Sequence, residues 1–174
     1  MATSLLARLD ARDRALFTRW AIGRSASRAI RMFWTALTHV GGFVFTVTDG
    51  GIPLLFEGAP RTAAVQALMT LGISHIVVHF LKRRIVRQRP SVRLDWHTMV
   101  VEPDRFSFPS GHSAAAMAVA IIFAASFPVL ALPLLLLACA VGLSRVCLGV
   151  HYPSDVFAGQ AIALATAAVM LGAW

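Results

Sequence analysis

Long apolar segments alternate with short polar or basic segments along this chain. The apolar runs cover 30–48, 62–81, 110–127, 128–147 and 154–174. Each is close to the ~20 residues that a helix needs to cross a bilayer. The turn-forming sequence Asp-Gly-Gly-Ile-Pro at 49–53 ends the first run, and a lysine at position 82 ends the second. The pattern predicts an all-α fold, a multi-span transmembrane helical bundle of about five spans.

The N-terminal arm has a different pattern, with bulky apolar side chains placed among arginines over 5–27. These apolar side chains are Leu5, Leu9, Leu16, Phe17 and Trp20. The pattern is typical of a basic amphipathic helix, which lies either on the membrane surface or against the rest of the protein. We therefore expect two parts, a basic amphipathic N-terminal arm over 1–29 and a membrane-embedded domain over 30–174.

The composition also favours lipid as the surrounding medium. Apolar residues make up 57% of the 174 residues and charged residues 14%, whereas soluble domains have about half and about a quarter. The chain is basic, with 16 Lys+Arg against 8 Asp+Glu. From Ser110 to Trp174, however, the only charged residues are Arg145 and Asp155. This half lacks the cationic face that nucleic acid would need, so we expect no nucleic-acid partner.

The distribution of cations predicts an orientation in the membrane. If the N-terminus is cytoplasmic, 15 of the 16 cations lie on that side and only Arg61 lies outside. Setting aside three cations with candidate chemical roles still leaves twelve against one. The positive-inside rule then predicts a multi-pass membrane protein with segment 82–109 on the cytoplasmic side. The high Ala and Arg content is typical of a GC-rich bacterial genome, so we expect the cell membrane to be a bacterial inner membrane. Arg83, Arg84 and Arg87 are interpreted as contacts to anionic lipid headgroups.

Three polar clusters fall at membrane borders on the same side of the predicted bundle. The first runs from Lys82 to Pro90, and the second is Phe-Pro-Ser-Gly-His at 108–112. The third joins Ser-Arg at 144–145 to His151 and Asp155. Two spans separate the second cluster from the third, so the chain leaves this side and returns to it. The three clusters can therefore converge on one site.

The residue types in these clusters suit an anionic phosphoryl group. Planar guanidinium groups of Arg89 and Arg145 match phosphate oxygens bidentately, and Lys82, the only lysine of the chain, offers a compact charge. Ser110 is a natural helix N-cap, and Gly111 allows an oxyanion to approach the backbone closely. The free N–H groups at a helix N-terminus then favour an anion. For the tetrapeptide Pro-Ser-Gly-His at 109–112 taken alone, a capped helix with an incidental histidine is as good an explanation as an anion site.

Two pairs of residues, one His–Asp and one His–His, have helical spacing. His151 and Asp155 are four residues apart and share a helix face. A carboxylate bonded to one ring nitrogen fixes the tautomer and leaves the other nitrogen as a nucleophile. Taken alone, however, this spacing is better explained by a structural His–Asp pair that caps the span. His75 and His79 have the same spacing on the second run; a buried hydrogen-bonded pair is favoured over a metal site, and His79 could line the site.

Taken together, the clusters resemble the type 2 phosphatidic acid phosphatase family. Its signature is Lys, six residues, Arg-Pro; then Pro-Ser-Gly-His; then Ser-Arg, five residues, His, three residues, Asp. Every fixed position is present here with that spacing, from Lys82 to Asp155. The resemblance covers about residues 62–174.

The resemblance implies roles for these residues. His151 would be the nucleophile that takes the phosphoryl group, Asp155 would orient it, and His112 would act as general acid and then as general base. The phosphate oxygens would be bound by Lys82, Arg89, Ser110, Gly111 and Arg145. The family needs no metal and no other cofactor, and the sequence has no carboxylate cluster beside the site that could hold magnesium.

The implied function is phosphate removal from a lipid in the membrane. Candidate substrates are phosphatidic acid, phosphatidylglycerol phosphate, and polyprenyl phosphates or diphosphates. One alternative, a vanadate-dependent haloperoxidase, is disfavoured because those relatives are large and soluble. The other is a non-catalytic lipid-phosphate binder or transporter. Such a protein would be expected to lose His112 or His151, and both are kept. The sequence gives no expectation for the oligomeric state.

Overall fold

The computed structural model describes residues 2–23 and 25–173, with side chains from residue 8 onward. Within this part the chain forms eight α-helices and two short 3-10 helices, which confirms the all-α class. They are α1 (Ala2–Trp20), α2 (Arg28–Val40), α3 (Phe43–Gly51), η1 (Ile52–Leu55), α4 (Ala59–Ile85), α5 (Pro90–Arg93), α6 (Gly111–Ser126), η2 (Pro128–Leu130), α7 (Ala131–Cys147) and α8 (Pro153–Gly172). Residues 1 and 24 and the Leu5 side chain of the predicted arm lie outside this description, as does residue 174 of the last predicted run.

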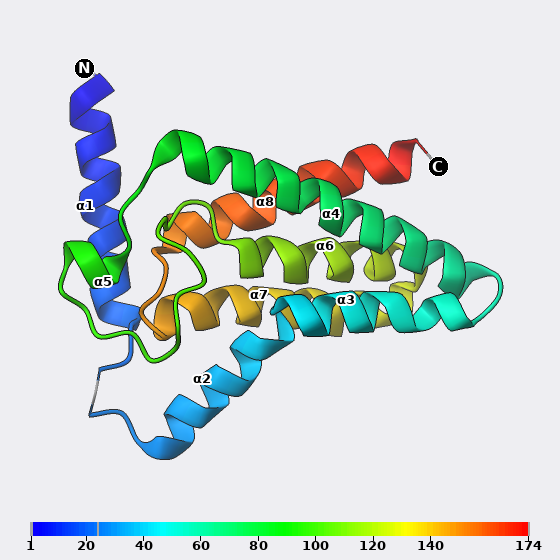
Figure 1. Ribbon diagram of the computed structural model, residues 1–174, viewed down its shortest axis with the longest axis horizontal. Coiled ribbons are helices and arrows are strands. Elements are labelled where there is room, and N and C mark those ends of the chain that lie inside the picture. Colours follow the sequence, from blue (N-terminus) through cyan, green and yellow to red (C-terminus); the bar gives the residue numbers. More distant parts are fainter. Residues whose placement is uncertain (1, 24, 174) are drawn as a thin grey trace.

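Helix α6 is the centre of the bundle, and α4, α7 and α8 pack around it (Figure 1). Its buried positions are mostly alanines, such as Ala115, Ala118 and Ala120, which face Leu71 of α4 and Ala163 of α8. Small side chains let helices approach closely, which is the usual packing solution where lipid surrounds the bundle. Figure 1 shows α1 and the end of α8 at opposite ends of the bundle, with α1 and α2 at the end where α4 stops and α6 begins.

Several helices are apolar enough to cross a membrane. Among the described residues, the three that are also long enough are Ala59–Ile85, Pro128–Cys147 and Pro153–Gly172. They coincide with the predicted runs 62–81, 128–147 and 154–174. Two shorter apolar helical segments accompany them, Phe43–Leu55 and Gly111–Ser126.

The prediction of one uninterrupted span over 30–48 is wrong. The chain bends at Gly41-Gly42, so α2 ends at Val40 and leaves the bundle at an angle to α3 (Figure 1). Two consecutive glycines weaken a helix. The missing side chain of Gly41 also makes room for Val141 and for the backbone carbonyl of His112. The predicted break at 49–53 is wrong too, because helical structure continues through Gly51 to η1.

Helix α1 packs against the bundle along one face. Phe17 is fully buried among Val146, Tyr152 and Val156, and its ring makes edge contacts with Tyr152 and Trp96 at centroid distances of 5.5 and 5.3 Å. The apolar side chains of Leu9, Leu16 and Trp20 remain exposed. The Phe17 face of this amphipathic helix therefore packs against the rest of the protein, which was one of the two predicted alternatives. The exposed apolar side chains form a second face that points away from the bundle.

Helix α8 crosses the start of α6 at Gly159, and this contact generates a stability prediction. A Cβ atom at Gly159 would overlap the carbonyl oxygen of Ser110 and lie 3.3 Å from the backbone nitrogen of Ala114. Backbone atoms cannot move aside as a flexible side chain can. We expect Gly159→Ala to lower the free energy of unfolding by about 1–3 kcal/mol, measured as a lower melting temperature in detergent.

The matched control is Gly72→Ala, also inside a helix, where the added Cβ would meet nothing within 4 Å in the described part of the chain. Alanine has the higher helix propensity, so its melting temperature should be equal or higher. An unchanged melting temperature for Gly159→Ala would contradict the tight α6–α8 crossing.

Candidate active site

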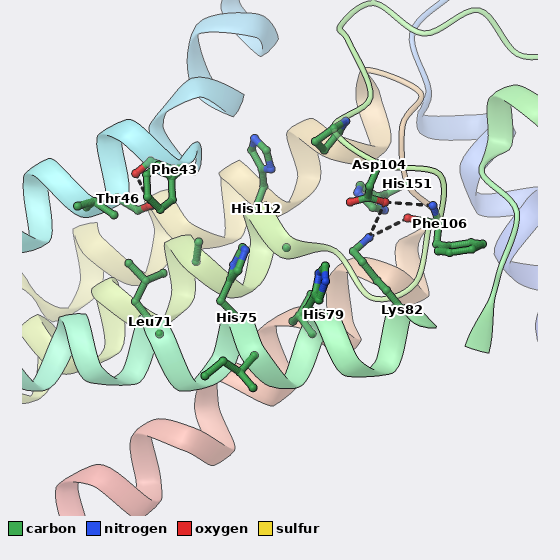
Figure 2. Close-up of a pocket in the computed structure, with 18 of the residues that line it drawn as sticks. Phe43, Thr46, Leu71, His75, His79, Lys82, Asp104, Phe106, His112 and His151 are labelled. Atoms are coloured by element: carbon green, nitrogen blue, oxygen red, sulfur yellow. Dashed lines mark hydrogen bonds and ion pairs between the residues drawn. The ribbon is translucent and has the colours of Figure 1, made fainter. Parts of the chain in front are cut away.

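The structure brings the three polar clusters together at one end of the bundle. The end of α4, the start of α6 and the loop before α8 meet around a cavity of about 1030 Å³. Lys82, Gly111, His112 and His151 line this cavity, and Figure 2 shows His112, His151 and Lys82 around its polar end. The remaining predicted site residues, Arg89, Ser110, Arg145 and Asp155, are almost completely buried.

His151 and Asp155 lie side by side at the start of α8. Nδ1 of His151 is 3.5 Å from Oδ2 of Asp155. The same carboxylate oxygen accepts the backbone N–H of Tyr152 at 2.8 Å and the hydroxyl of Ser107. Nε2 of His151 faces a different group, Nη1 of Arg89, at 3.4 Å. One ring nitrogen is therefore held by the carboxylate, while the other faces the cations of the site.

The surroundings of His151 favour its neutral form. Burial lowers the pKa of His151 to about 3, Arg89 and Arg145 act in the same direction, and Asp155 opposes them. At neutral pH the imidazole is therefore uncharged. With Nδ1–H directed to the carboxylate, the lone pair is on Nε2, as a nucleophilic histidine requires.

Lys82 and Arg89 share one carboxylate, that of Asp104. Nζ of Lys82 lies 3.2 Å and Nη2 of Arg89 3.0 Å from Oδ1 of Asp104. Burial raises the pKa of Asp104, but Lys82 and Arg89 outweigh it and hold that pKa below its usual range. Arg89 also donates to the backbone carbonyls of Asp104 and Val150, both at 2.8 Å. Asp104, which the sequence did not single out, thus lies where an anionic ligand of these cations would lie.

Arg145 has unused donors. Its side chain is buried in α7, and Nη1 donates to the hydroxyl of Thr38 at 2.6 Å. Its Nε and Nη2 groups are buried and find no hydrogen-bond partner among the described residues. A buried guanidinium with unsatisfied donors is costly unless an anion accepts from it. This donor set matches a phosphate.

The start of α6 is built as the sequence predicts. Ser110 is the N-cap, and its side chain accepts the backbone N–H of Ser113 at 3.4 Å. The backbone N–H of Ser110 donates to the carbonyl of Asp155 at 2.9 Å, which ties α6 to α8. Gly111 and His112 follow in the first turn and line the cavity. The helix N-terminus therefore faces the same space as His151.

The interpretation of Arg87 as a lipid headgroup contact is wrong. α4 ends in a left-handed turn at Val86, which directs the following residues back to the bundle. Nη1 of Arg87 donates to Oδ1 of Asp155 at 2.7 Å, and its guanidinium lies 4.2 Å above the ring centre of Tyr152. Ser107, the donor to the other carboxylate oxygen, was also missed. A polar residue between two phenylalanines just before the Pro-Ser-Gly-His motif was the available signal.

His75 and His79 line the cavity, and Figure 2 shows both rings projecting from α4 towards it. Both residues are exposed, so the favoured interpretation as a buried pair is wrong, whereas the expectation that His79 lines the site is confirmed. Among the described residues, no group of three or more histidine, cysteine or acidic side chains could hold a metal ion.

The cavity has an apolar part that runs along α3 and α4, away from the cations. Its lining residues there are Phe43, Val47, Leu68, Leu71, Gly72 and Ile76. Leu68 and Lys82 are fourteen residues apart on one continuous helix, which corresponds to roughly 21 Å. The loop at 103–106 lines the polar end. One cavity therefore joins a cationic end to a long apolar groove.

Comparison with known proteins identifies the family. Residues 63–174 match the PAP2 superfamily. The chain is 36% identical over 128 residues to decaprenylphosphoryl-5-phosphoribose phosphatase of Mycolicibacterium smegmatis, covering 71% of this chain and 68% of that protein. It is 39% identical over 97 residues to lipid A 1-phosphatase of Rhizobium johnstonii, covering 53% and 40%.

A solved structure agrees in fold. The transmembrane PAP2-type phosphatidylglycerolphosphate phosphatase of Bacillus subtilis superposes with a TM-score of 0.75 at 26% identity, over 95% of this chain and 85% of that chain. The matched residues include all three polar clusters. The chain is therefore a multi-pass membrane protein and a phosphatase, and it belongs to the PAP2 superfamily of membrane lipid phosphatases.

Proposed function

We propose that the protein is a metal-independent phosphatase for lipid phosphates or diphosphates that works through a phosphohistidine intermediate. The observation that carries this proposal is the single cavity with a cationic end and an apolar groove, because a lipid phosphate has both parts. Candidate substrates are phosphatidic acid, phosphatidylglycerol phosphate and polyprenyl phosphates or diphosphates. The similarity to the decaprenylphosphoryl-5-phosphoribose phosphatase supports testing polyprenyl-linked phosphates first.

In the first step, cations and backbone N–H groups bind the phosphate oxygens, on which negative charge accumulates during transfer. Lys82, Arg89 and Arg145 supply the charge, and Ser110 and Gly111 form the helix N-terminus. Substrate phosphate takes the place of the Asp104 carboxylate between Lys82 and Arg89. These contacts hold phosphorus in line with His151.

The transfer itself uses the two histidines. Nε2 of His151 attacks phosphorus and forms a P–N bond while the bond from phosphorus to the lipid oxygen breaks. His112 gives its proton to that oxygen, so the lipid leaves as an alcohol or, from a diphosphate, as a monophosphate. Asp155 stabilises the positive charge that develops on the imidazole of His151.

Hydrolysis of the intermediate regenerates the protein. A water molecule attacks phosphorus while His112 takes its proton, and the P–N bond breaks to release inorganic phosphate. His151 returns to its neutral form.

We further propose five membrane crossings, in which the two shorter apolar segments complete the three long helices. The basic arm over 1–29 then stays outside the membrane-embedded domain over 30–174. The polar end of the cavity faces the cytoplasm, as the distribution of arginines indicates.

The nucleophile assignment predicts that His151→Ala reduces phosphate release by at least roughly 10³-fold, because the proposed covalent intermediate forms on Nε2 of His151. Expression and melting temperature should stay near those of the unchanged protein. His97→Ala, at an exposed histidine outside this cavity, is the matched control and should keep full activity. Near-normal turnover by His151→Ala would overturn the assignment.

The groove predicts a selective loss of lipid substrates. Gly72 lines the apolar part of the cavity, so Gly72→Phe should exclude a hydrocarbon tail from it. The kcat/KM for the lipid substrates should then fall by roughly 10-fold or more. Release of phosphate is measured with EDTA present from phosphatidic acid, phosphatidylglycerol phosphate, undecaprenyl diphosphate and p-nitrophenyl phosphate. Phosphate release from the soluble aryl phosphate should be unaffected. The control variant Gly172→Phe, at the end of α8, should release phosphate from all four substrates at the unchanged rate. Equal losses on all substrates would contradict a tail groove, and activity that returned only with magnesium would contradict the metal-free mechanism.

The proposed orientation predicts which end of the bundle is accessible from outside the cell. Glu57 and His97 are both exposed, and Glu57 precedes the long span α4 in the chain whereas His97 follows it. In a background with Cys139 and Cys147 replaced, an impermeant thiol reagent should label Glu57→Cys but not His97→Cys in intact cells. Labelling of His97→Cys but not of Glu57→Cys would show that the orientation is the reverse of the one proposed.

A further inference from the structure

The two oxygens of the Asp155 carboxylate have different partners. Oδ2 faces Nδ1 of His151 and accepts from Ser107 and from the backbone of Tyr152. Oδ1 accepts from Nη1 of Arg87 at 2.7 Å. Asp155 is completely buried, and the Arg87 side chain is only 15% exposed. Arg87 therefore fixes the oxygen that the histidine does not use, although it occupies a variable position of the family signature.

Arg87 is itself held from several directions. Its Nη1 also donates to the hydroxyl of Ser154 at 2.7 Å, and its guanidinium stacks over the ring of Tyr152. Its Nη2 donates to the Asp13 carboxylate of α1. Asp13 is buried and also accepts the backbone N–H of Ser154 at 2.9 Å. A continuous chain of charge-assisted bonds thus runs from α1 through Arg87 to Asp155.

We propose that Arg87 is a positioning residue for the His151–Asp155 pair, and that α1 holds Arg87 in place through Asp13. The N-terminal helix is then part of the support of the active site. This inference rests on the proposed function, in which His151 is the nucleophile. A carboxylate that can rotate away from Nδ1 leaves the imidazole free to turn, and a misplacement of about 1 Å can cost 10²-fold in rate.

The bond to Arg87 also sets how strongly Asp155 acts on His151. Four charged or titratable groups face His151. They are Arg89 from the loop after α4, Arg145 from α7, His112 from α6 and Asp155 from α8. Without Arg87, Asp155 has His151 as its nearest counter-charge, which stabilises the imidazolium form and raises the pKa of His151. The nucleophile then becomes protonated, and inactive, at a higher pH.

The first experiment replaces Arg87 and follows kcat, KM and the pH profile with p-nitrophenyl phosphate and with phosphatidic acid in mixed micelles. Arg87→Met should lower kcat about 10- to 100-fold, change KM less than about threefold, and move the acid limb of kcat/KM to higher pH. Arg87→Lys should recover part of the rate, because it keeps the charge without the two-pronged geometry. The control is Arg84→Met, at an exposed arginine near the end of α4, which should behave as the unchanged protein.

The second experiment tests the link to α1 with a double-mutant cycle. Asp13→Asn should lower kcat about 3- to 10-fold in the unchanged protein and have little further effect on Arg87→Met, because both act through one chain of bonds. Asp10→Asn is the comparison, since Asp10 pairs with Arg93 at 2.8 Å and lies 3.6 Å from Arg87. It should have the smaller effect. Fully additive losses of Asp13→Asn and Arg87→Met would overturn the link.

The outcomes separate this inference from the proposed function. Full activity of His151→Ala would overturn the assignment of His151 as the nucleophile, and with it the proposed function. An inactive His151→Ala beside an Arg87→Met variant with normal kcat and pH profile would overturn the inference alone. The same holds if Arg87→Met only lowers the melting temperature, because a purely structural role would leave the pH profile unchanged.

Discussion

The buried charge of Asp155 is the constraint on which the rest of this site depends. A carboxylate without water costs several kcal/mol unless hydrogen bonds and a counter-charge compensate it. Here the compensation comes from Arg87, Ser107 and the backbone of Tyr152, with His151 alongside. The carbonyl of the same residue accepts the N–H of Ser110. Asp155, through its carboxylate and its backbone carbonyl, therefore ties together the loop after α4 and the starts of α6 and α8.

The buried cations follow the same rule with one exception. Lys82 and Arg89 share the carboxylate of Asp104, and Arg87 lies between Asp13 and Asp155. The guanidinium of Arg145 has only the neutral hydroxyl of Thr38 as a hydrogen-bond partner among the described residues. The unused donors of Arg145 are therefore free to bind an anion, and the apolar groove beside them matches the lipid tail of the proposed substrate.

Much of this was predictable because the signals are local. Apolar runs predicted the helices from 62 onward, and the order and spacing of the three motifs predicted that their residues meet at one end of the bundle. The bend at Gly41-Gly42 escaped because apolar residues continue through it. Arg87 escaped because it looks like its neighbours Arg83 and Arg84, while its partners lie 68 and 74 residues away in the sequence. Contacts over such distances leave no periodicity to read.

The long sequence separation of these contacts has a consequence for biosynthesis. Asp13 bonds to Ser154, 141 residues later, and Thr38 bonds to Arg145, 107 residues later. At typical translation rates of about 5–20 residues per second, Asp13 waits roughly 7 to 28 s for its partner to be made. For much of this interval Arg87 already exists without Asp155. The site is therefore completed only when the final helix enters the bundle, and a ribosome that stops before α8 leaves a protein in which Arg87 lacks its partner Asp155.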